Sequence, residues 1–245
     1  MGMDAPTTAG FIVRPYQPGD REAVRDLCCQ TGFLGKPIDP VFEDRELFAS
    51  FLTDYYLQCE ADSAFMVIVG GTIKGYLLGC RFPRRHQIYS ISQGIPLVLK
   101  ALTRYPRYSS ESRRYLLWIA LNAWREVPEA PRNVGHFHMN FMPELKRLAV
   151  FRAVLERYLR FLSDNQVKQI SAQMVTFDDR RTIGLFERYG FKVLNRSKIT
   201  KFQRFTSEAV YLSTIVKDVI EKGDRVLYQV APGTKSPPAG LIRNH

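Results

Sequence analysis

The sequence predicts an α/β protein, and three stretches carry this prediction. Residues 135–191 alternate strand-like and helix-like hydrophobic periods in the order strand, helix, strand, helix. Residues 65–82 form two strand-like runs around a Gly-Gly dipeptide, which is typical of a β-hairpin. Residues 11–28 begin with a strand-like run and continue with helical spacing. Together they indicate a sheet with helices packed on it.

The amino-terminal third is expected to contribute two helices. A strand at 11–16 leads to a helix for which Asp20 is the predicted N-cap. Residues 31–40 contain two glycines and two prolines and are expected to form a loop. A second helix follows at 43–60, with one apolar side made of Leu47, Phe48, Phe51, Leu52 and Tyr55.

Residues 83–134 form an insertion between the third and fourth expected strands. About fifty residues are too many for one structureless loop. Helices are expected near 90–103 and 111–124, separated by residues 104–108. Two interpretations stay open: a lid that shapes a pocket, or a helical pair that only covers the core. The side chains that suit planar or anionic ligands there are Tyr105, Arg107, Tyr108, Arg113 and Arg114.

The 135–191 unit has clear boundaries. Its first strand, 136–142, stops at Pro143, and the second is expected at 169–177. The helix between them carries an inward stripe of Leu148, Phe151, Leu155, Tyr158, Leu159 and Leu162. Asp178 and Asp179 are the predicted cap of a short helix that ends at Gly190, with Ile183, Phe186 and Tyr189 facing inward.

Two closing strands are expected at 192–202 and 209–216, which completes one predicted domain over residues 1–231. Residues 232–245 hold three prolines and two glycines and are expected to be a flexible tail.

Composition narrows the class of protein. The 245 residues include 35 Lys and Arg against 24 Asp and Glu, which gives a net charge of +11. The basic residues do not form a run of the nucleic-acid type, so nucleic acid is an unlikely partner. The cysteines, at 28, 29, 59 and 80, lack metal-ligand spacing, and no metal is expected. Without a signal peptide or an apolar span, we expect a soluble, cytoplasmic protein, with a homodimer as an open possibility.

Two motifs in the 135–191 unit resemble the GCN5-related N-acetyltransferase (GNAT) superfamily. They are Met142-Pro143-Glu144 after the first strand and Phe186-Glu187-Arg188-Tyr189-Gly190-Phe191 at the end of the last helix. The resemblance implies a mixed, mostly antiparallel sheet flanked by helices, with strands four and five splayed apart. It also implies that acetyl-CoA enters that gap and that its acetyl group passes to a small-molecule or peptide amine.

The family binds pyrophosphate on a Gln/Arg-x-x-Gly-x-Gly/Ala turn, which aligns here with residues 146–151. Asp179 stands where the family usually has Asn, and Phe186 stands where it often has a proton-donating Tyr. The ring of Phe151 is expected in the core rather than over the phosphates. The resemblance assigns coenzyme binding to Phe141, Met142, Lys146, Arg147, Leu148, Ala149, Val150, Phe151, Arg152, Asp179 and Phe186.

The catalytic candidates are His138, Asn140, Glu144 and Tyr189. His136, His138 and Asn140 share one face of their strand. That strand is similar to His-Leu-His-Ile-Asp in the acetyltransferase-like group associated with O-GlcNAc hydrolases, with Asn140 in place of Asp. The expected base is His138, His136 or an ordered water. Glu144 is a further candidate, unless it caps the next helix or meets Arg147. Tyr189 would replace the missing donor only if its helix were rotated or the ligand displaced.

Each candidate has a competing structural interpretation. Two histidines on a half-buried strand are often hydrogen-bonded core residues, and a zinc site lacks a third ligand fixed by spacing. The replacements at Asn140, Phe151 and Phe186 also fit a catalytically degenerate binding module that keeps the fold.

Overall fold

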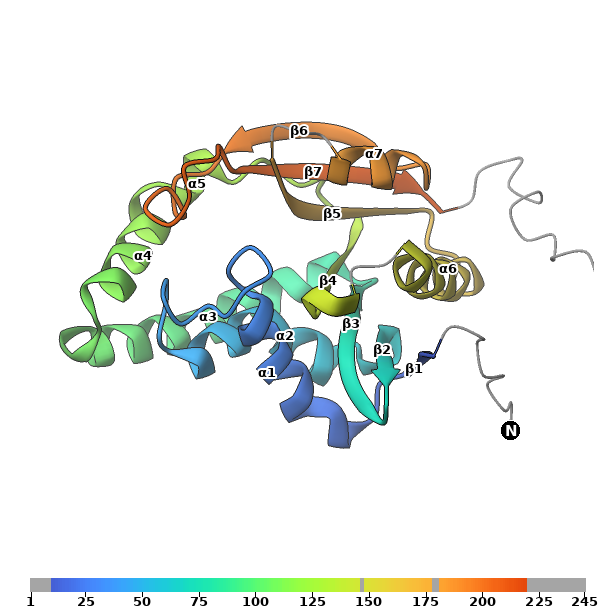
Figure 1. Cartoon of the computed structure of the whole chain (residues 1–245), viewed down its shortest axis with the longest axis horizontal. Coiled ribbons are helices and arrows are strands. Elements are labelled where there is room, and N and C mark those ends of the chain that lie inside the picture. Colours follow the sequence, from blue (N-terminus) through green and yellow to red (C-terminus); the bar gives the residue numbers. More distant parts are fainter. Residues whose placement is uncertain (1–9, 146–147, 178–180, 220–245) are drawn as a thin grey trace, which may run out of the picture.

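The computed structural model describes residues 10–145, 148–177 and 181–219, so the predicted tail and the last part of the predicted domain, residues 220–231, lie outside it. Helices and strands alternate along the chain (Figure 1). They are β1 (Ile12–Pro15), α1 (Arg21–Thr31), α2 (Arg45–Cys59), β2 (Ala64–Val69), β3 (Thr72–Cys80), α3 (Pro83–Arg104), α4 (Ser110–Leu121), α5 (Ala123–Glu126), β4 (Gly135–Phe141), α6 (Leu148–Asp164), β5 (Gln169–Thr176), α7 (Arg181–Glu187), β6 (Lys192–Lys198) and β7 (Tyr211–Asp218).

The strands form one seven-stranded sheet in the order β1-β2-β3-β4-β5-β7-β6. The hairpin between β2 and β3 turns through Gly70 and Gly71, whose φ angles of 55° and 78° are those of a primed turn. All described strand pairs are antiparallel except β4 with β5. The predicted mixed, mostly antiparallel sheet flanked by helices is therefore confirmed.

The parallel contact between β4 and β5 is very short. It consists of Gly135 opposite Ile170 and His136 opposite Ser171, although β4 has seven residues and β5 has eight. Beyond these two pairs the strands diverge, and the sheet opens into a lower part, β1 to β4, and an upper part, β5 to β7 (Figure 1). This divergence is the splay that the family resemblance implies.

Two buried clusters cover the two faces of the sheet. On one face, α6 and α7 pack against the odd-numbered β4 side chains, among them Phe137. Gly190 ends the last helix region with a φ of 77°, and Phe191 then enters this cluster with 2% of its surface exposed. On the other face, α1, α2 and the insertion pack around Tyr76 and Cys28.

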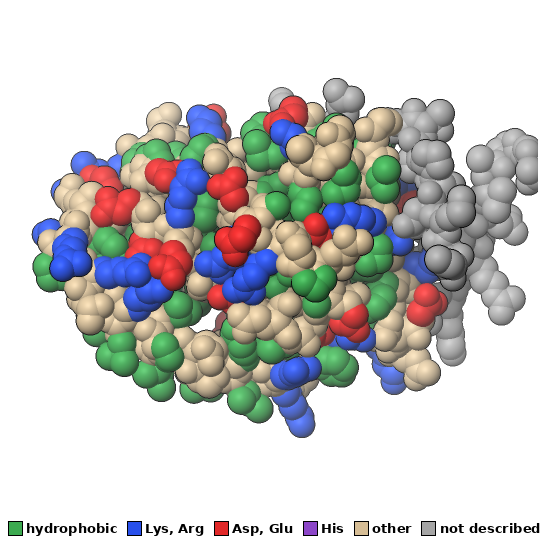
Figure 2. All heavy atoms as spheres, turned by 90° about the horizontal axis from the view of Figure 1, so that it is seen from below, with side chains coloured by type: hydrophobic (Ala, Val, Ile, Leu, Met, Phe, Trp, Pro, Cys, Tyr) green, Lys and Arg blue, Asp and Glu red, His purple; other side chains and the backbone are tan. Residues whose placement is uncertain are grey.

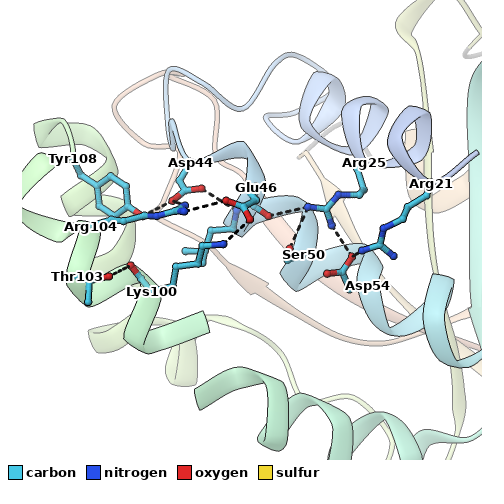
Figure 3. Close-up of polar contacts among 11 residues, drawn as sticks. Arg21, Arg25, Asp44, Glu46, Ser50, Asp54, Lys100, Thr103, Arg104 and Tyr108 are labelled. Atoms are coloured by element: carbon cyan, nitrogen blue, oxygen red, sulfur yellow. Dashed lines mark hydrogen bonds and ion pairs between the residues drawn. The ribbon is translucent and has the colours of Figure 1, made fainter. Parts of the chain in front are cut away.

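The insertion bridges the two parts of the opened sheet. At its start, α3 reaches α2 through ion pairs from Lys100 to Glu46 and from Arg104 to Asp44 (Figure 3). At its end, the carboxylate of Glu126 accepts hydrogen bonds from the Trp118 indole at 2.8 Å and from the Thr200 backbone N–H at 2.6 Å. The first anchor belongs to the lower part of the sheet and the second to the loop between β6 and β7.

Several local predictions are corrected. Phe51 is 73% exposed and Leu148 is 53% exposed, because both lie outside the contact area of their helices. Asp20 stands at the predicted N-cap position of α1, but its carboxylate makes no capping bond to that helix. It accepts instead from both terminal nitrogens of Arg14, at 2.6 and 2.7 Å, and from the backbone N–H of Gln17. The first insertion helix begins at Pro83, earlier than expected, because proline is favourable in the first helical turn.

The bridge at Glu126 gives a stability prediction. Glu126→Ala leaves the backbone N–H and the hydroxyl of Thr200 without their carboxylate acceptor, and the Trp118 indole keeps only its 3.1 Å bond to the Thr200 hydroxyl. We expect the free energy of unfolding to fall by about 1–3 kcal/mol. Urea denaturation measures the loss. Glu129→Ala is the matched control, because that exposed residue contributes only its backbone carbonyl, to Asn195, and its replacement should change stability little. Equal losses in both variants would contradict the bridge.

Candidate active site

The opening between β4 and β5 exposes a strand edge. The backbone N–H of Met142 donates to the Lys74 carbonyl at 2.9 Å. In an antiparallel pair, every second residue of a strand turns its backbone N–H and C=O toward the partner strand. The backbone groups of Asn140 and His138 therefore point toward β3 as well. The backbone groups of Met139 and Phe141 therefore point toward β5, whose pairing with β4 has already ended at Ser171. This edge presents peptide groups suited to an extended, amide-containing ligand.

A polar group lies beside this edge, on the face opposite α6. The amide nitrogen of Asn140 donates to the Tyr76 hydroxyl at 3.0 Å, and the His138 ring lies 5.5 Å from the Tyr76 ring between centroids. Cys28 of α1 completes the group from behind Tyr76; burial raises the pKa of its thiol to about 12. Because this thiol stays protonated at neutral pH, Cys28 is not a nucleophile.

His138 has the properties of an uncharged imidazole. Its Nδ1 is shielded from solvent and has no hydrogen-bond partner in the described chain. Burial lowers the pKa of His138 to about 4, and a backbone contact with Leu52 partly opposes this shift. The ring is neutral at pH 7 and has a free ring nitrogen, which is the form of imidazole that accepts protons, but the burial that keeps it neutral also makes it a weak base.

His136 lies farther down the same strand face and belongs to an aromatic cluster. Its ring is 4.6 Å from that of His86, which comes from α3, and 5.8 Å from that of Tyr56. Burial, followed by the two neighbouring histidines, lowers the pKa of His136 to about 3. The core interpretation thus fits His136, whereas His138 is the histidine beside the strand edge.

The amino-terminal turn of α6 is accessible at the end of β4. Leu148 and Ala149 are exposed, whereas Val150 and Phe151 are buried, with 1% and 6% of their surfaces exposed. The Phe151 ring packs edge-on against Phe186 at 5.0 Å. The core position expected for this ring is confirmed, so it does not cover the helix terminus, where backbone N–H groups attract phosphate. The turn therefore fits a pyrophosphate group.

Other predicted site residues lie apart from His138. Tyr189 and Phe186 are in the aromatic cluster on the α6 face, across the sheet from His138 and Asn140. Arg152 is paired with Glu156 at 2.7 Å on the outer side of α6. Glu144 meets Lys74 at 3.4 Å. Lys146, Arg147, Asp178 and Asp179 fall outside the described residues.

Tyr105, Tyr108, Arg113 and Arg114, four of the insertion side chains predicted to bind ligands, contact neighbours within the insertion or at the start of α2. Tyr108 is buried and donates to Asp44 at 2.6 Å (Figure 3), Arg113 lies over the Tyr105 ring, and Arg114 pairs with Glu111. Lys201, which was not among the predicted residues, lies near the rings of Trp118 and Phe202, and burial lowers its pKa to about 8. No local signal marks it, because α4 supplies that environment from far along the chain.

The described residues contain no group of three His, Cys, Asp or Glu side chains able to hold a metal ion. None of their helices combines the length and the hydrophobicity that crossing a bilayer requires.

The chain matches no protein-family model and no curated protein. Solved structures do match. SsHAT is 23% identical over 86% of this chain and 100% of its own, with a TM-score of 0.60. A structure named only as an acetyltransferase is 13% identical over 85% and 100% of the two chains, with a TM-score of 0.51. A mutant of agmatine N-acetyltransferase in its apo form is 14% identical over 85% and 99%, with a TM-score of 0.50. This chain thus has the fold of the GNAT acetyltransferases.

The low pKa of His138 gives a pH prediction. In the unfolded chain the pKa of this histidine is near 6.5. Below that pH the unfolded state binds a proton more readily than the folded state does, so the free energy of unfolding falls. Between pH 7 and pH 5 we expect the unfolding free energy to drop by about 1–2 kcal/mol more in the unmodified protein than in His138→Gln. Urea titrations at both pH values measure this difference. Parallel pH profiles would contradict an uncharged, buried His138.

Proposed function

We propose that this protein is an acetyl-CoA-dependent N-acetyltransferase that transfers the acetyl group directly to an amine. The observation that carries the proposal is the opening of the sheet after two β4–β5 residue pairs, beside an imidazole with an unpaired ring nitrogen. The acetyltransferases that share the fold support it. The closer affiliation with the group associated with O-GlcNAc hydrolases rests on the sequence of β4 and is part of the proposal.

In the proposed reaction the amine nitrogen attacks the thioester carbonyl carbon, and the bond from that carbon to sulfur breaks. The free peptide groups of Met139 and Phe141 hold the amide-rich arm of the coenzyme along β4. The accessible amides of the α6 terminus receive its pyrophosphate. His138 takes the proton that the amine loses, and water protonates the leaving thiolate, because Phe186 has no proton to give.

A second candidate function is a binding module that has kept the fold and lost catalysis. The observation that favours it concerns the proton donor that the family often uses: Phe186 stands in place of that tyrosine, and Tyr189 lies across the sheet from His138. Such a protein would bind acetyl-CoA without consuming it.

Calorimetry with acetyl-CoA and thiol release with a panel of polyamines, aminosugars and peptide amines separate the two functions. No binding at millimolar acetyl-CoA would rule out both. For the enzyme, we expect His138→Gln to lower kcat about a hundredfold while acetyl-CoA affinity is kept, because general-base catalysis contributes about that much. Glu22→Gln, on the exposed surface of α1, is the control. Binding without thiol release from any amine would leave only the binding module.

The buried ring of Phe151 gives a further test. Phe151→Leu removes ring contacts with Phe186 and Tyr189, and we expect it to destabilise the protein by about 1–3 kcal/mol without improving acetyl-CoA affinity. Denaturation and calorimetry measure the two effects separately. A tenfold gain in affinity, about 1.4 kcal/mol, would mean that the native ring obstructs the phosphate site.

A further inference from the structure

The helix α3 presents its most hydrophobic side to solvent. None of its 22 residues is buried. Ile88, Ile91, Ile95, Val98 and Leu102 follow one another at spacings of three and four residues, which is the spacing of a coiled-coil seam. Between 57% and 71% of each of these side chains, and 57% of Leu99, is exposed. We call these six residues the α3 seam.

The opposite side of α3 faces the protein and is already occupied. Tyr89, Leu97 and Ala101 pack against the core cluster on that side. Lys100 and Arg104 point toward α2, where they pair with Glu46 and Asp44 (Figure 3). The α3 seam, by contrast, is the side of the helix that is turned away from the protein. Figure 2 shows hydrophobic side chains along the lower edge of the left half of the molecule, the half that contains α3. Soluble monomers seldom leave such a continuous apolar patch uncovered.

We infer that the α3 seam is the contact surface of a homodimer in which two copies of α3 pack antiparallel around a twofold axis at Ile95. Such a contact is self-complementary. Positions equally distant from Ile95 then meet: Ile88 meets Leu102 of the second copy, and Ile91 meets its Leu99. Antiparallel packing also brings the positive end of each helix dipole next to the negative end of the other.

The charge pattern favours a second copy over a lipid surface. Interfacial helices combine an apolar face with Lys and Arg that reach lipid headgroups. On α3 no charged residue lies between Arg85 and Lys100, and Lys100 and Arg104 are paired with carboxylates of α2. A charge-free seam meets an identical seam without repulsion, and Ser92 and Gly94 beside it leave room for a close helix approach.

Disulfide trapping tests both the contact and its direction. In a Cys59→Ser background, which removes the one cysteine that is not buried, Ile95→Cys places both thiols at the twofold axis. Under mild oxidation we expect it to shift from 28.2 kDa to twice that mass. Ile88→Cys is the matched control, because its two copies would lie roughly 20 Å apart, far beyond disulfide reach. Mixing the Ile88→Cys protein with the Leu102→Cys protein should give a cross-linked dimer of the two variants, because these positions meet in the proposed contact.

Sedimentation of the full chain tests the contact without cross-linking. We expect a dimer for the unmodified protein and a monomer with an unchanged melting temperature for Ile95→Lys, because the side chain is 62% exposed and contributes little to folding. A monomeric unmodified protein at 100 micromolar overturns the proposal. Self-cross-linking of Ile88→Cys also overturns it. A third contrary result would be an unmodified protein that sediments with phosphatidylserine vesicles as a monomer and loses this vesicle binding in the Ile95→Lys variant.

Discussion

Only two residue pairs join β4 to β5, and the remaining structure is arranged around this short parallel contact. An opened sheet lacks the backbone hydrogen bonds that would hold its two parts together, so side-chain packing must do so. On one face α6 supplies that packing through Val154, Leu155 and Tyr158, which are completely buried. On the other face the insertion connects α2 to the loop after β6. The opening can therefore persist in a stable fold.

Several of the basic residues form ion pairs within the protein. Arg21 and Arg25 share the carboxylate of Asp54, and the basic residues of α3 share those of Asp44 and Glu46 (Figure 3). These pairs are partly exposed and individually weak. The first two join α1 to α2, and the others join α3 to the amino-terminal end of α2. Part of the positive charge on these helices thus serves contacts within the protein.

Burial sets the chemistry of the polar group beside the opening. The same desolvation that keeps the Cys28 thiol protonated keeps the His138 imidazole neutral, because both shifts disfavour the charged form. Cys28 is thereby removed from nucleophilic chemistry, and His138 is the uncharged imidazole that the proposed reaction uses. This division of roles supports direct transfer to the amine rather than transfer through an acetylated cysteine.

The sequence by itself determined the fold class, the hairpin at Gly70 and Gly71, the insertion between strands three and four, and the shared face of His138 and Asn140, because these depend on local periodicity and turn chemistry. It predicted inward-facing positions for Phe51 and Leu148, which are exposed. An apolar residue type does not by itself show whether a helix position is covered by the rest of the protein. Only the tertiary structure decided that Tyr189 lies across the sheet from His138, that Lys201 meets Trp118, and that α3 turns its aliphatic side outward. Each of these depends on contacts between segments far apart in the chain, which local patterns do not encode.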